Sequence, residues 1–338
     1  MASTCLAGCA RRLQLAAYII ALILSAAAAH PAAAGLNLQT PAEQSLTEQT
    51  EPDLSAAVSD AKTTGRAVSV TDYRGQQIRL SRPATRILAL SPHIVENAFS
   101  AGAGKYLVGV VEYADYPEQA ISIERVGSNN LLNMERIVSL QPDLIIAWGS
   151  GNKQRSIAQL EQLGFSVYVD EPKTLEDIAR SITDIGVLAG TLPHAETAVA
   201  AYRQQLIKLG SMPDKEPPIS VFYQVWNEPL QTLNGEHLIS QAISLCGGIN
   251  IFAQEQVIAP VVSIESVLAR DPQVVLASGV SAQRPPWLDE WLQWRQMRAV
   301  KSGHLFHVPP DLVQRHTLRL MQGIEIICRQ LSSVKNKP

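Results

Sequence analysis

Two segments of the chain share one pattern of polar and apolar positions. Residues 133–147 and 263–277 align without a gap, although they lie 130 positions apart. Each begins with a residue whose side-chain oxygen can cap a helix, Asn133 or Ser263, and reaches a proline after a short helical stretch. Each then ends in an uninterrupted apolar run, which is typical of a strand covered on both faces. The pattern predicts a helix and a buried strand, present twice.

This repeat predicts two similar α/β lobes. A period of 130 residues is far too long for a solenoid. It instead places Glu135 and Glu265 at equivalent points, each in the first turn of a predicted helix. A protein with two lobes has a cleft between them, and such clefts are preferred ligand sites.

The rest of the chain alternates between strand and helix patterns. Two short runs around the turn at residues 73–75 predict a leading hairpin. Further strands are predicted at residues 86–90, 107–111, 219–225 and 305–308, and helices at 91–101, 174–189, 193–209, 238–246, 288–300 and 314–331. The alternation favours mostly parallel sheets with helices on both faces, which is an α/β fold.

These patterns divide the chain into five segments. We expect a signal peptide at residues 1–34, a flexible leader at 35–66, an N-terminal α/β lobe with the leading hairpin at 67–191, a linking helix at 192–212 and a C-terminal α/β lobe at 213–333. The leader is rich in Ala, Ser, Thr, Gln and Glu without a sustained apolar period, so it needs no fold of its own.

The N-terminus has the features of an export signal. Arg11 and Arg12 precede an apolar stretch, and small residues follow, with cleavage expected after Ala29 or Ala34. The alternative is a membrane-spanning helix, but the clearly apolar part is short and no positively charged flank follows it. We therefore expect an exported protein.

Removal of the signal peptide leaves two of the four cysteines, Cys246 and Cys328. In an oxidising compartment such a pair predicts one disulfide. The bond would close a loop of 82 residues, and in the chain-entropy account this closure stabilises the fold by about 4–5 kcal/mol. The alternative is two buried free thiols.

Charge and motif spacing exclude several function classes. The formal net charge is −3 and no basic stripe is present, which argues against nucleic-acid binding. No group of residues has the spacing of a structural metal site, and His304 and His307 face opposite sides of a short predicted strand. The sequence contains no GxSxG, P-loop or HExxH motif.

Trp287, Trp291 and Trp294 share one helical face, which predicts core packing, with a ligand cage as the alternative.

Several stretches, taken in order, resemble one known family. They are residues 87–92, 109–117, 133–137, 142–148 and 246–252. Between about Arg82 and Leu331 the chain resembles the class III, helical-backbone substrate-binding proteins of ABC importers. That family carries ferric siderophores, haem and corrinoids, and the resemblance is to its cobalamin-binding members in particular.

The resemblance implies two Rossmann-like lobes joined by one long rigid α-helix, a periplasmic location and a monomeric protein. It implies cobalamin or a related corrinoid as the bound ligand, with haem or a ferric siderophore as the alternative cargo. It further implies delivery to an ABC permease dimer with its ATPase on the membrane. No resident cofactor, metal or enzymatic activity is implied.

The resemblance also carries candidate ligand contacts. Tyr113 and Trp148 match aromatic positions of the family's cleft, and Trp226 lies one place from a cleft loop. Asp311 and Arg315 match an acidic–basic pair that can meet the ligand's amide edge. A corrinoid is a flat, mostly apolar macrocycle fringed with amides, so rigid aromatic rings and a few polar groups suit it. For each aromatic residue the alternative is a place in the core or at its edge.

Other cleft positions depart from the family pattern or have a less specific role. Asn129 and Ala259 stand where the family has tryptophans, which thins the aromatic wall. His93 follows the first strand on the expected cleft side, where it can meet the ligand's metal or a peripheral amide. The alternative for His93 is a histidine at a helix N-terminus that faces solvent.

The resemblance assigns Glu135 and Glu265 to contacts with arginines of the permease. A carboxylate in the first turn also favours the helix dipole, whatever its function. The dipole alone does not explain why both lobes place a glutamate at the same point.

A two-lobed hydrolase or chelatase remains as a further alternative. Acids such as Glu112, Asp115 and Asp311 could perform acid–base chemistry in a cleft. No nucleophile–base pair is visible in the sequence, which favours a binding protein.

Overall fold

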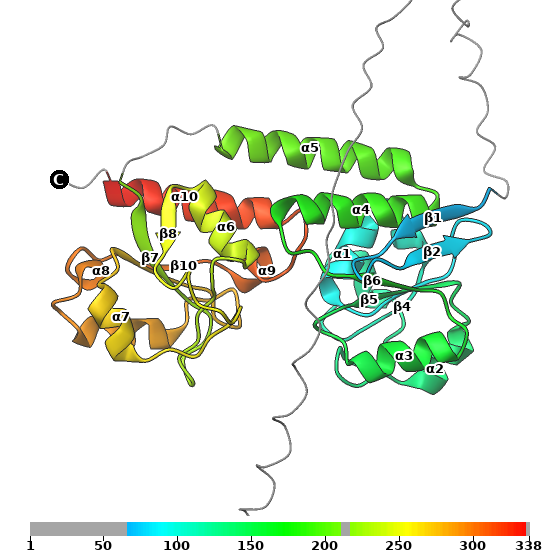
Figure 1. The fold of residues 1–338 in the computed structure, drawn as a ribbon, viewed down its shortest axis with the longest axis horizontal. Helices are drawn as coiled ribbons and strands as arrows, with labels where there is room; N and C mark the ends of the chain where they lie inside the picture. The colour runs from blue at the N-terminus through cyan, green and yellow to red at the C-terminus, as the bar shows by residue number, and fades with distance from the viewer. Residues whose placement is uncertain (1–65, 211–216, 336–338) are drawn as a thin grey trace, which may run out of the picture. The chain divides into compact units, whose positions relative to one another are not determined.

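The computed structural model describes residues 66–210 and 217–335 (Figure 1). The expected signal peptide and all but the last residue of the expected leader lie outside the described residues. Among the residues that are described, no helix is long and apolar enough to cross a membrane.

The first half of the described chain forms a hairpin and a four-stranded parallel sheet. The hairpin pairs β1 (Val68–Thr71) with β2 (Gln77–Leu80) in antiparallel register, as predicted. The sheet has the order β4-β3-β5-β6 and contains β3 (Ile87–Ala89), β4 (Leu107–Val110), β5 (Leu144–Trp148) and β6 (Val167–Asp170). Its helices are α1 (Pro92–Ser100), α2 (Met134–Leu140), α3 (Gln154–Gln162) and α4 (Leu175–Ala189), with short 3-10 helices η2 (Gly104–Tyr106) and η3 (Glu118–Ser122).

The second half forms another four-stranded parallel sheet. Its order is β10-β9-β7-β8, and its strands are β7 (Ile219–Gln224), β8 (Gly248–Asn250), β9 (Val274–Ala277) and β10 (Leu305–His307). The helices are α6 (Leu238–Leu245), α7 (Ile264–Arg270), α8 (Arg298–Lys301), α9 (Pro310–Val313) and α10 (Leu320–Lys335), with the 3-10 helix η4 (Pro286–Gln293).

The two sheets share one topology. If the strands of each sheet are counted along the chain, both have the spatial order second, first, third, fourth. All strand pairs within these two sheets are parallel. The α/β fold class with two similar sheets, predicted from the repeat, is therefore confirmed.

Helix α5 (Leu192–Gly210) leads from the first sheet toward the second. Gly190 ends α4 in the left-handed conformation, and a β-carbon there would lie 2.9 Å from Pro83, so glycine suits this turn. Figure 1 shows α5 running beside α4 on one side and near α10 on the other, and it packs against both helices. The expected linking helix at 192–212 corresponds to α5 as far as Gly210.

The core follows from the alternation of side chains along each strand. In β3, Ile87 and Ala89 point to a core shared with α1 and α4, whereas Leu88 points to the opposite face under α2 and α3. In β7, Tyr223 belongs to the first of these cores and Phe222 to a third core with η4 and α7. Each sheet is thus covered on both faces, as the uninterrupted apolar runs predicted.

The duplicated helix and strand have the same local geometry in both halves. The side chain of Asn133 accepts from the backbone N–H of Arg136 at the start of α2, and Ser263 caps α7 in the same way. Both helices end at a non-glycine residue in the left-handed region, Gln141 with φ 45° and Asp271 with φ 40°. The prediction of two equivalent helix–strand units is confirmed, and the last helical residue, Leu140 or Arg270, lies two positions before the proline.

Two predicted helices are shorter than expected. Residues 288–300 form η4 and the separate helix α8, because Trp294 and Met297 leave helical conformation. Residues 314–319 precede α10 instead of forming its first turns. These residues contact α1 instead. The His316 carbonyl accepts a hydrogen bond from Asn97 Nδ2, whereas in a continuous helix this carbonyl would accept from the helix backbone.

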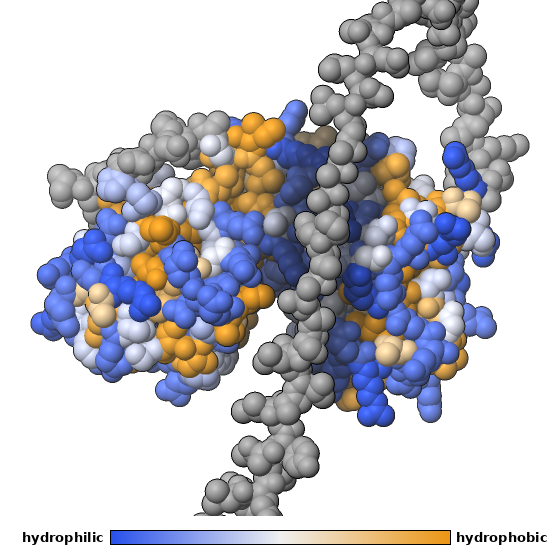
Figure 2. Space-filling model, in the orientation of Figure 1, coloured by the Kyte–Doolittle hydropathy of each residue, from blue (hydrophilic) through white to orange (hydrophobic). Residues whose placement is uncertain are grey.

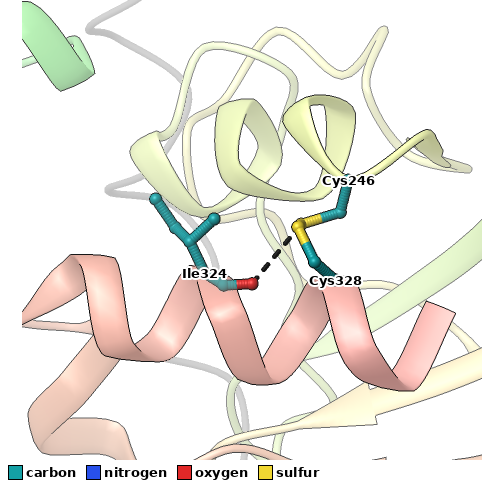
Figure 3. The surroundings of a disulfide bond; sticks show 3 residues. All are labelled: Cys246, Ile324 and Cys328. Carbon is teal, nitrogen blue, oxygen red and sulfur yellow. Dashed lines mark hydrogen bonds between the residues drawn. A yellow bond between two sulfur atoms is a disulfide. The ribbon is translucent and has the colours of Figure 1, made fainter. Parts of the chain in front are cut away.

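The predicted disulfide between Cys246 and Cys328 is present. Figure 3 shows it joining the end of α6 to the middle of α10, with the Cys246 sulfur 3.4 Å from the carbonyl oxygen of Ile324. The bond fixes the C-terminal helix to the second sheet, so the alternative of two free thiols does not apply.

Candidate functional site

A cavity of about 220 Å³ lies between residues of the two halves of the chain. It is lined by Ser91, Pro92, His93, Asn129 and Trp148 of the first half and by Val280, Pro310, Asp311, Gln314 and Arg315 of the second. Four of the six residues predicted to contact a ligand are in this lining, namely His93, Trp148, Asp311 and Arg315. The other two, Tyr113 and Trp226, are not.

The cavity lies where strands of both sheets end. His93 follows β3, and Trp148 is the last residue of β5. Val280 follows β9, and Asp311 and Arg315 come after β10. Because the carboxyl ends of parallel strands meet at one edge of a sheet, residues far apart in sequence are brought together here. This edge is the usual ligand site of an open α/β sheet.

The indole of Trp148 is held by its neighbours. It meets the His93 ring edge to face, with centroids 5.2 Å apart and planes at 86°. The backbone N–H of Trp148 donates to Asn152 Oδ1 at 2.7 Å. A β-carbon at Gly151 would lie only 1.7 Å from the indole, so glycine is required for this packing. The result is a rigid aromatic wall on one side of the cavity.

His93 is buried, with 5% of its surface exposed. Its Nδ1 lies 2.6 Å from Ser91 Oγ, and its Nε2 lies 3.5 Å from a carboxylate oxygen of Asp170. Asp170, at the end of β6, also accepts a hydrogen bond from Ser181. The interpretation of His93 as a solvent-facing helix-end residue is therefore wrong, because β5 and β6 bring Trp148 and Asp170 over the first turn of α1.

Three histidines form a column that crosses from the first half of the chain to the second. The His93 and His316 rings have centroids 5.8 Å apart, and the His316 and His237 rings are 6.0 Å apart. Burial lowers the pKa of His237 to about 4. Burial, together with the neighbouring His93 and His237, also lowers the pKa of His316 well below its usual value. His237 and His316 therefore favour the neutral imidazole.

Arg315 is the centre of an ion cluster that joins the two halves. Its Nη1 lies 2.8 Å from both Glu96 and Asp115, and its Nη2 lies 3.1 Å from Asp311. Arg319 adds a second guanidinium 3.2 Å from Glu96. Burial acts to lower the pKa of Arg315, but hydrogen bonds to Asp115 and Glu96 outweigh it and raise that pKa.

The ion cluster also lowers the pKa of one of its acids, Asp115. Partial burial acts to raise the pKa of Asp115, but the hydrogen bond and charge of Arg315 outweigh it and lower that pKa. Asp115 is therefore a stable anion next to the cavity. The arginine expected to meet a ligand is already paired with three carboxylates.

Tyr113 and Trp226 are exposed beyond the cavity. Tyr113 is 77% exposed and adopts φ 63°, which is uncommon for a bulky residue. Its backbone carbonyl accepts from Arg315 Nη2 at 3.4 Å, so the residue is close to the ion cluster. Trp226 is 41% exposed, and its Nε1 donates to the carbonyl of Glu228. Figure 2 shows apolar patches on the surface of both halves of the molecule.

Glu135 and Glu265 lie in the first turns of α2 and α7, and both are exposed. Hydrogen bonds from its own backbone N–H and from Ser263 lower the pKa of Glu265. Figure 1 shows α2 and α7 on the side of their sheets away from α5 and α10. The two acids therefore have equivalent settings on equivalent helices.

A second, larger cavity of about 510 Å³ is formed by α1, α5, α10 and Tyr116. Its buried charges, Glu96 and Arg319, are already paired with each other, and the Arg319 guanidinium covers the Tyr116 ring at 4.0 Å. It does not lie at the carboxyl ends of the strands. The smaller cavity beside Trp148 is therefore the better candidate site.

The tryptophans of η4 border a small separate cavity with Asn227, Leu230 and Ile264. Trp291 is buried, packs against Phe222 and donates to Gln224, which agrees with the prediction of core packing. In the described parts of the chain, no group of three or more His, Cys, Asp or Glu residues could hold a metal ion.

Sequence reasoning missed several residues of the site. His316 and His237 were not identified, and neither were Asn152 and Asp170, which support Trp148 and His93. Asp170 is the last residue of β6, and Asn152 lies four residues after the apolar run that ends at Trp148, so both are near the edge where ligands bind. His316 and His237 gave no such signal, because their contacts depend on how the two halves pack.

Comparison with known proteins gives consistent matches. Residues 87–312 match the model of the periplasmic binding protein family. The vitamin B12-binding protein of Vibrio cholerae is 40% identical over 250 residues, which is 74% of this chain and 90% of that protein. The vitamin B12-binding protein of Yersinia pestis is 37% identical over 257 residues, covering 75% of this chain and 89% of that one.

Solved structures agree with these sequence matches. The crystal structure of the periplasmic vitamin B12 binding protein BtuF of Vibrio cholerae matches with a TM-score of 0.69 and 38% identity, covering 75% of this chain and 99% of that one. The periplasmic heme-binding protein RhuT from Roseiflexus matches with a TM-score of 0.65 but only 21% identity, over 74% of this chain and 99% of that one. The second match bears on the fold alone.

Proposed function

The chain belongs to the periplasmic binding protein family, and from this premise we propose that it is the substrate-binding protein of an ABC importer. Its cargo is cobalamin or a related corrinoid, which it binds between its two lobes and delivers to the permease. We assign the lobes to residues 67–191 and 213–333 and the linking segment to residues 192–212, of which Leu192–Gly210 is described as helix α5. The mature protein is a periplasmic monomer without catalytic activity.

The observation that carries this proposal is the cavity beside Trp148. Both sheets contribute their carboxyl edges to it, one wall is a fixed indole, and the opposite wall carries the polar groups of Asp311, Gln314 and Arg315. An aromatic wall facing a polar edge suits a flat macrocycle with amide side chains. The similarity to vitamin B12-binding proteins, at 40% identity, favours a corrinoid over other macrocycles.

The cavity of about 220 Å³ is smaller than a corrinoid. It therefore receives one edge of the macrocycle, and the remainder extends past the exposed rings of Tyr113 and Trp226. In this arrangement the two residues outside the cavity lining still contact the ligand, but from its periphery. Asn129 lines the cavity at a position where the family has a tryptophan, so the aromatic contact is concentrated on Trp148.

Glu135 and Glu265 are the contacts for the permease. They occupy equivalent first-turn positions in the two copies of the repeat, so they can meet two equivalent arginines of a permease dimer. Exposed ion pairs of this kind contribute little to affinity and act mainly on orientation and association rate.

Titration calorimetry with cyanocobalamin tests the cargo. We expect binding with a submicromolar dissociation constant, and no comparable binding of hemin or a ferric hydroxamate siderophore. If cyanocobalamin does not bind at tens of micromolar while hemin or the siderophore does, the corrinoid assignment is wrong. Conversion of any of these ligands to a product would instead support an enzyme.

A further inference from the structure

The polar edge of the candidate site carries more negative than positive charge. Three carboxylates, those of Glu96, Asp115 and Asp311, surround the single guanidinium of Arg315. Arg319 supplies a second positive charge, but it lies against Glu96 on the side of the larger cavity. The cluster of two arginines and three acids therefore keeps one net negative charge next to the ligand site.

Both terminal nitrogens of the Arg315 guanidinium already have hydrogen-bond or ion-pair partners. Its Nη1 contacts Glu96 and Asp115, and its Nη2 contacts Asp311 and the carbonyl of Tyr113. Arginine binds carboxylates best through two parallel N–H groups. That bidentate geometry requires terminal nitrogens that are already engaged here, so Arg315 is not a receptor for a ligand carboxylate.

A neutral amide of the ligand interacts with this edge more favourably than a carboxylate does. A carboxylate such as that of Asp311 accepts several hydrogen bonds, so its oxygens can receive the N–H groups of a neutral amide. A ligand carboxylate has no hydrogen to donate at neutral pH and would lie close to ionised acids, which repel it. Asp115 is 61% and Asp311 48% exposed at the side chain, so both acids face solvent next to the cavity.

We propose that Glu96, Asp115 and Asp311 act together as a charge filter at the ligand site. By neutralising Arg315 and leaving a net negative charge, they make the site select a macrocycle fringed with neutral amides over one of the same shape that carries carboxylates. This inference rests on the proposed function and identifies the residues that determine its ligand class. Glu96 anchors the cluster from within the interface, and the two aspartates act at the surface.

The test compares ligands that differ only in this charge. Cyanocobalamin is measured against its monocarboxylic derivatives, in which one peripheral propionamide is hydrolysed, each isomer separately and on purified mature protein. We expect the wild type to bind at least one isomer about tenfold more weakly than cyanocobalamin. The discrimination should shrink between low and high salt, because salt screens exposed charges.

Variants test whether the acids of this cluster cause the difference in affinity. In the double variant Asp115→Asn, Asp311→Asn the affinity ratio of cyanocobalamin to that isomer should fall to about threefold or less. The matched control is Asp289→Asn, which removes an aspartate of similar exposure from its pair with Arg284 and should leave the ratio unchanged. The buried Glu96 is left intact, so that loss of folding does not mimic the effect.

The outcomes separate this inference from the proposed function. If every isomer binds the wild type within about twofold of cyanocobalamin, the filter does not exist although the cargo assignment stands. An affinity ratio that stays unchanged in the double variant also overturns the filter. If cyanocobalamin itself does not bind the wild type, the proposed function has failed.

Discussion

The side-chain amide of Asn97 donates a hydrogen bond to the backbone carbonyl of His316 at 3.0 Å. Asn97 is fully buried in α1, and His316 precedes α10, so the bond joins the two halves of the chain. It holds the His316 ring between those of His93 and His237. The interface between the halves therefore contains partly buried titratable groups.

This arrangement predicts that stability falls in mild acid. The pKa of His237 is lowered to about 4 by burial, whereas an unfolded histidine titrates near 6.5. Between these values the unfolded chain binds more protons than the folded one, so the free energy of unfolding decreases as pH falls from about 6.5 to 4. We expect a loss of roughly 2–3 kcal/mol from this residue. Urea unfolding at a series of pH values measures it.

The control for this prediction is His237→Asn. His237 Nδ1 accepts from the backbone N–H of Ile239 at the start of α6, and asparagine keeps an acceptor at this capping position. The variant should therefore fold and show a shallower dependence on pH over the same range. His316 still titrates in the variant, so part of the dependence remains. An unchanged slope would show that His237 is not the group responsible.

Replacement of Trp148 tests the aromatic wall. The indole packs against His93 and lines the cavity, so Trp148→Ala removes a rigid contact surface. We expect cyanocobalamin binding to weaken by about 1–3 kcal/mol, as for buried aromatic residues at interfaces. Calorimetric titration measures the loss, and thermal unfolding shows whether the variant is still folded.

The matched variant is Trp226→Ala. Trp226 is 41% exposed and does not line the cavity, so its loss should weaken binding by less than about 1 kcal/mol. Equal losses in the two variants would contradict the proposed order of contacts. That result would show that the macrocycle contacts Trp226 as closely as it contacts Trp148.

The disulfide leads to two expectations: the unreduced protein has no free thiol, and removal of the bond lowers the free energy of unfolding. Thiol titration of the denatured, unreduced mature protein should detect no free cysteine. Cys246→Ala with Cys328→Ala should lower the free energy of unfolding by about 4–5 kcal/mol, because the bond closes a loop of 82 residues. Denaturant unfolding measures this, and the wild type under reducing conditions should behave like the variant. A change below about 1 kcal/mol would contradict the prediction.

The sequence predicts those features of the fold that are local. The caps Asn133 and Ser263, the apolar runs of β5 and β9 and the helix predicted at 174–189 each depend on a few neighbouring residues. Their pattern therefore carries the information directly, and its repetition adds the equivalence of the two sheets. The helices predicted at 288–300 and 314–331 were too long because contacts with distant residues decide where these helices end.

The contacts between the two halves could not be predicted from the sequence. The bonds from Arg315 to Glu96 and from Asn97 to His316 both join residues 219 positions apart. Their pairing depends on how the two halves of the chain pack against each other, and no local pattern encodes it. The resemblance to a known family supplied Arg315 and Asp311 as candidates, but not Glu96 and Asp115, which also pair with Arg315.

The last prediction concerns Glu135 and Glu265. Both are exposed in first turns of equivalent helices, on the side of the sheets away from α5 and α10 (Figure 1). Glu135→Ala with Glu265→Ala should leave cyanocobalamin affinity unchanged, because neither residue lines the cavity. The double variant should show reduced vitamin uptake and weaker binding to the permease in proteoliposomes. Binding by the wild type should also weaken as salt rises, since exposed ion pairs are screened.

A control with the same change in charge separates docking from net charge. Glu196 on α5 and Glu325 on α10 are exposed, and their helices lie on the other side of the molecule from α2 and α7 (Figure 1). Their double replacement by alanine removes two negative charges but should leave permease binding intact. If this control weakens docking as much as the Glu135, Glu265 variant, the effect comes from overall charge. If the Glu135, Glu265 variant docks normally, the two glutamates have no role in recognition and serve only their helix dipoles.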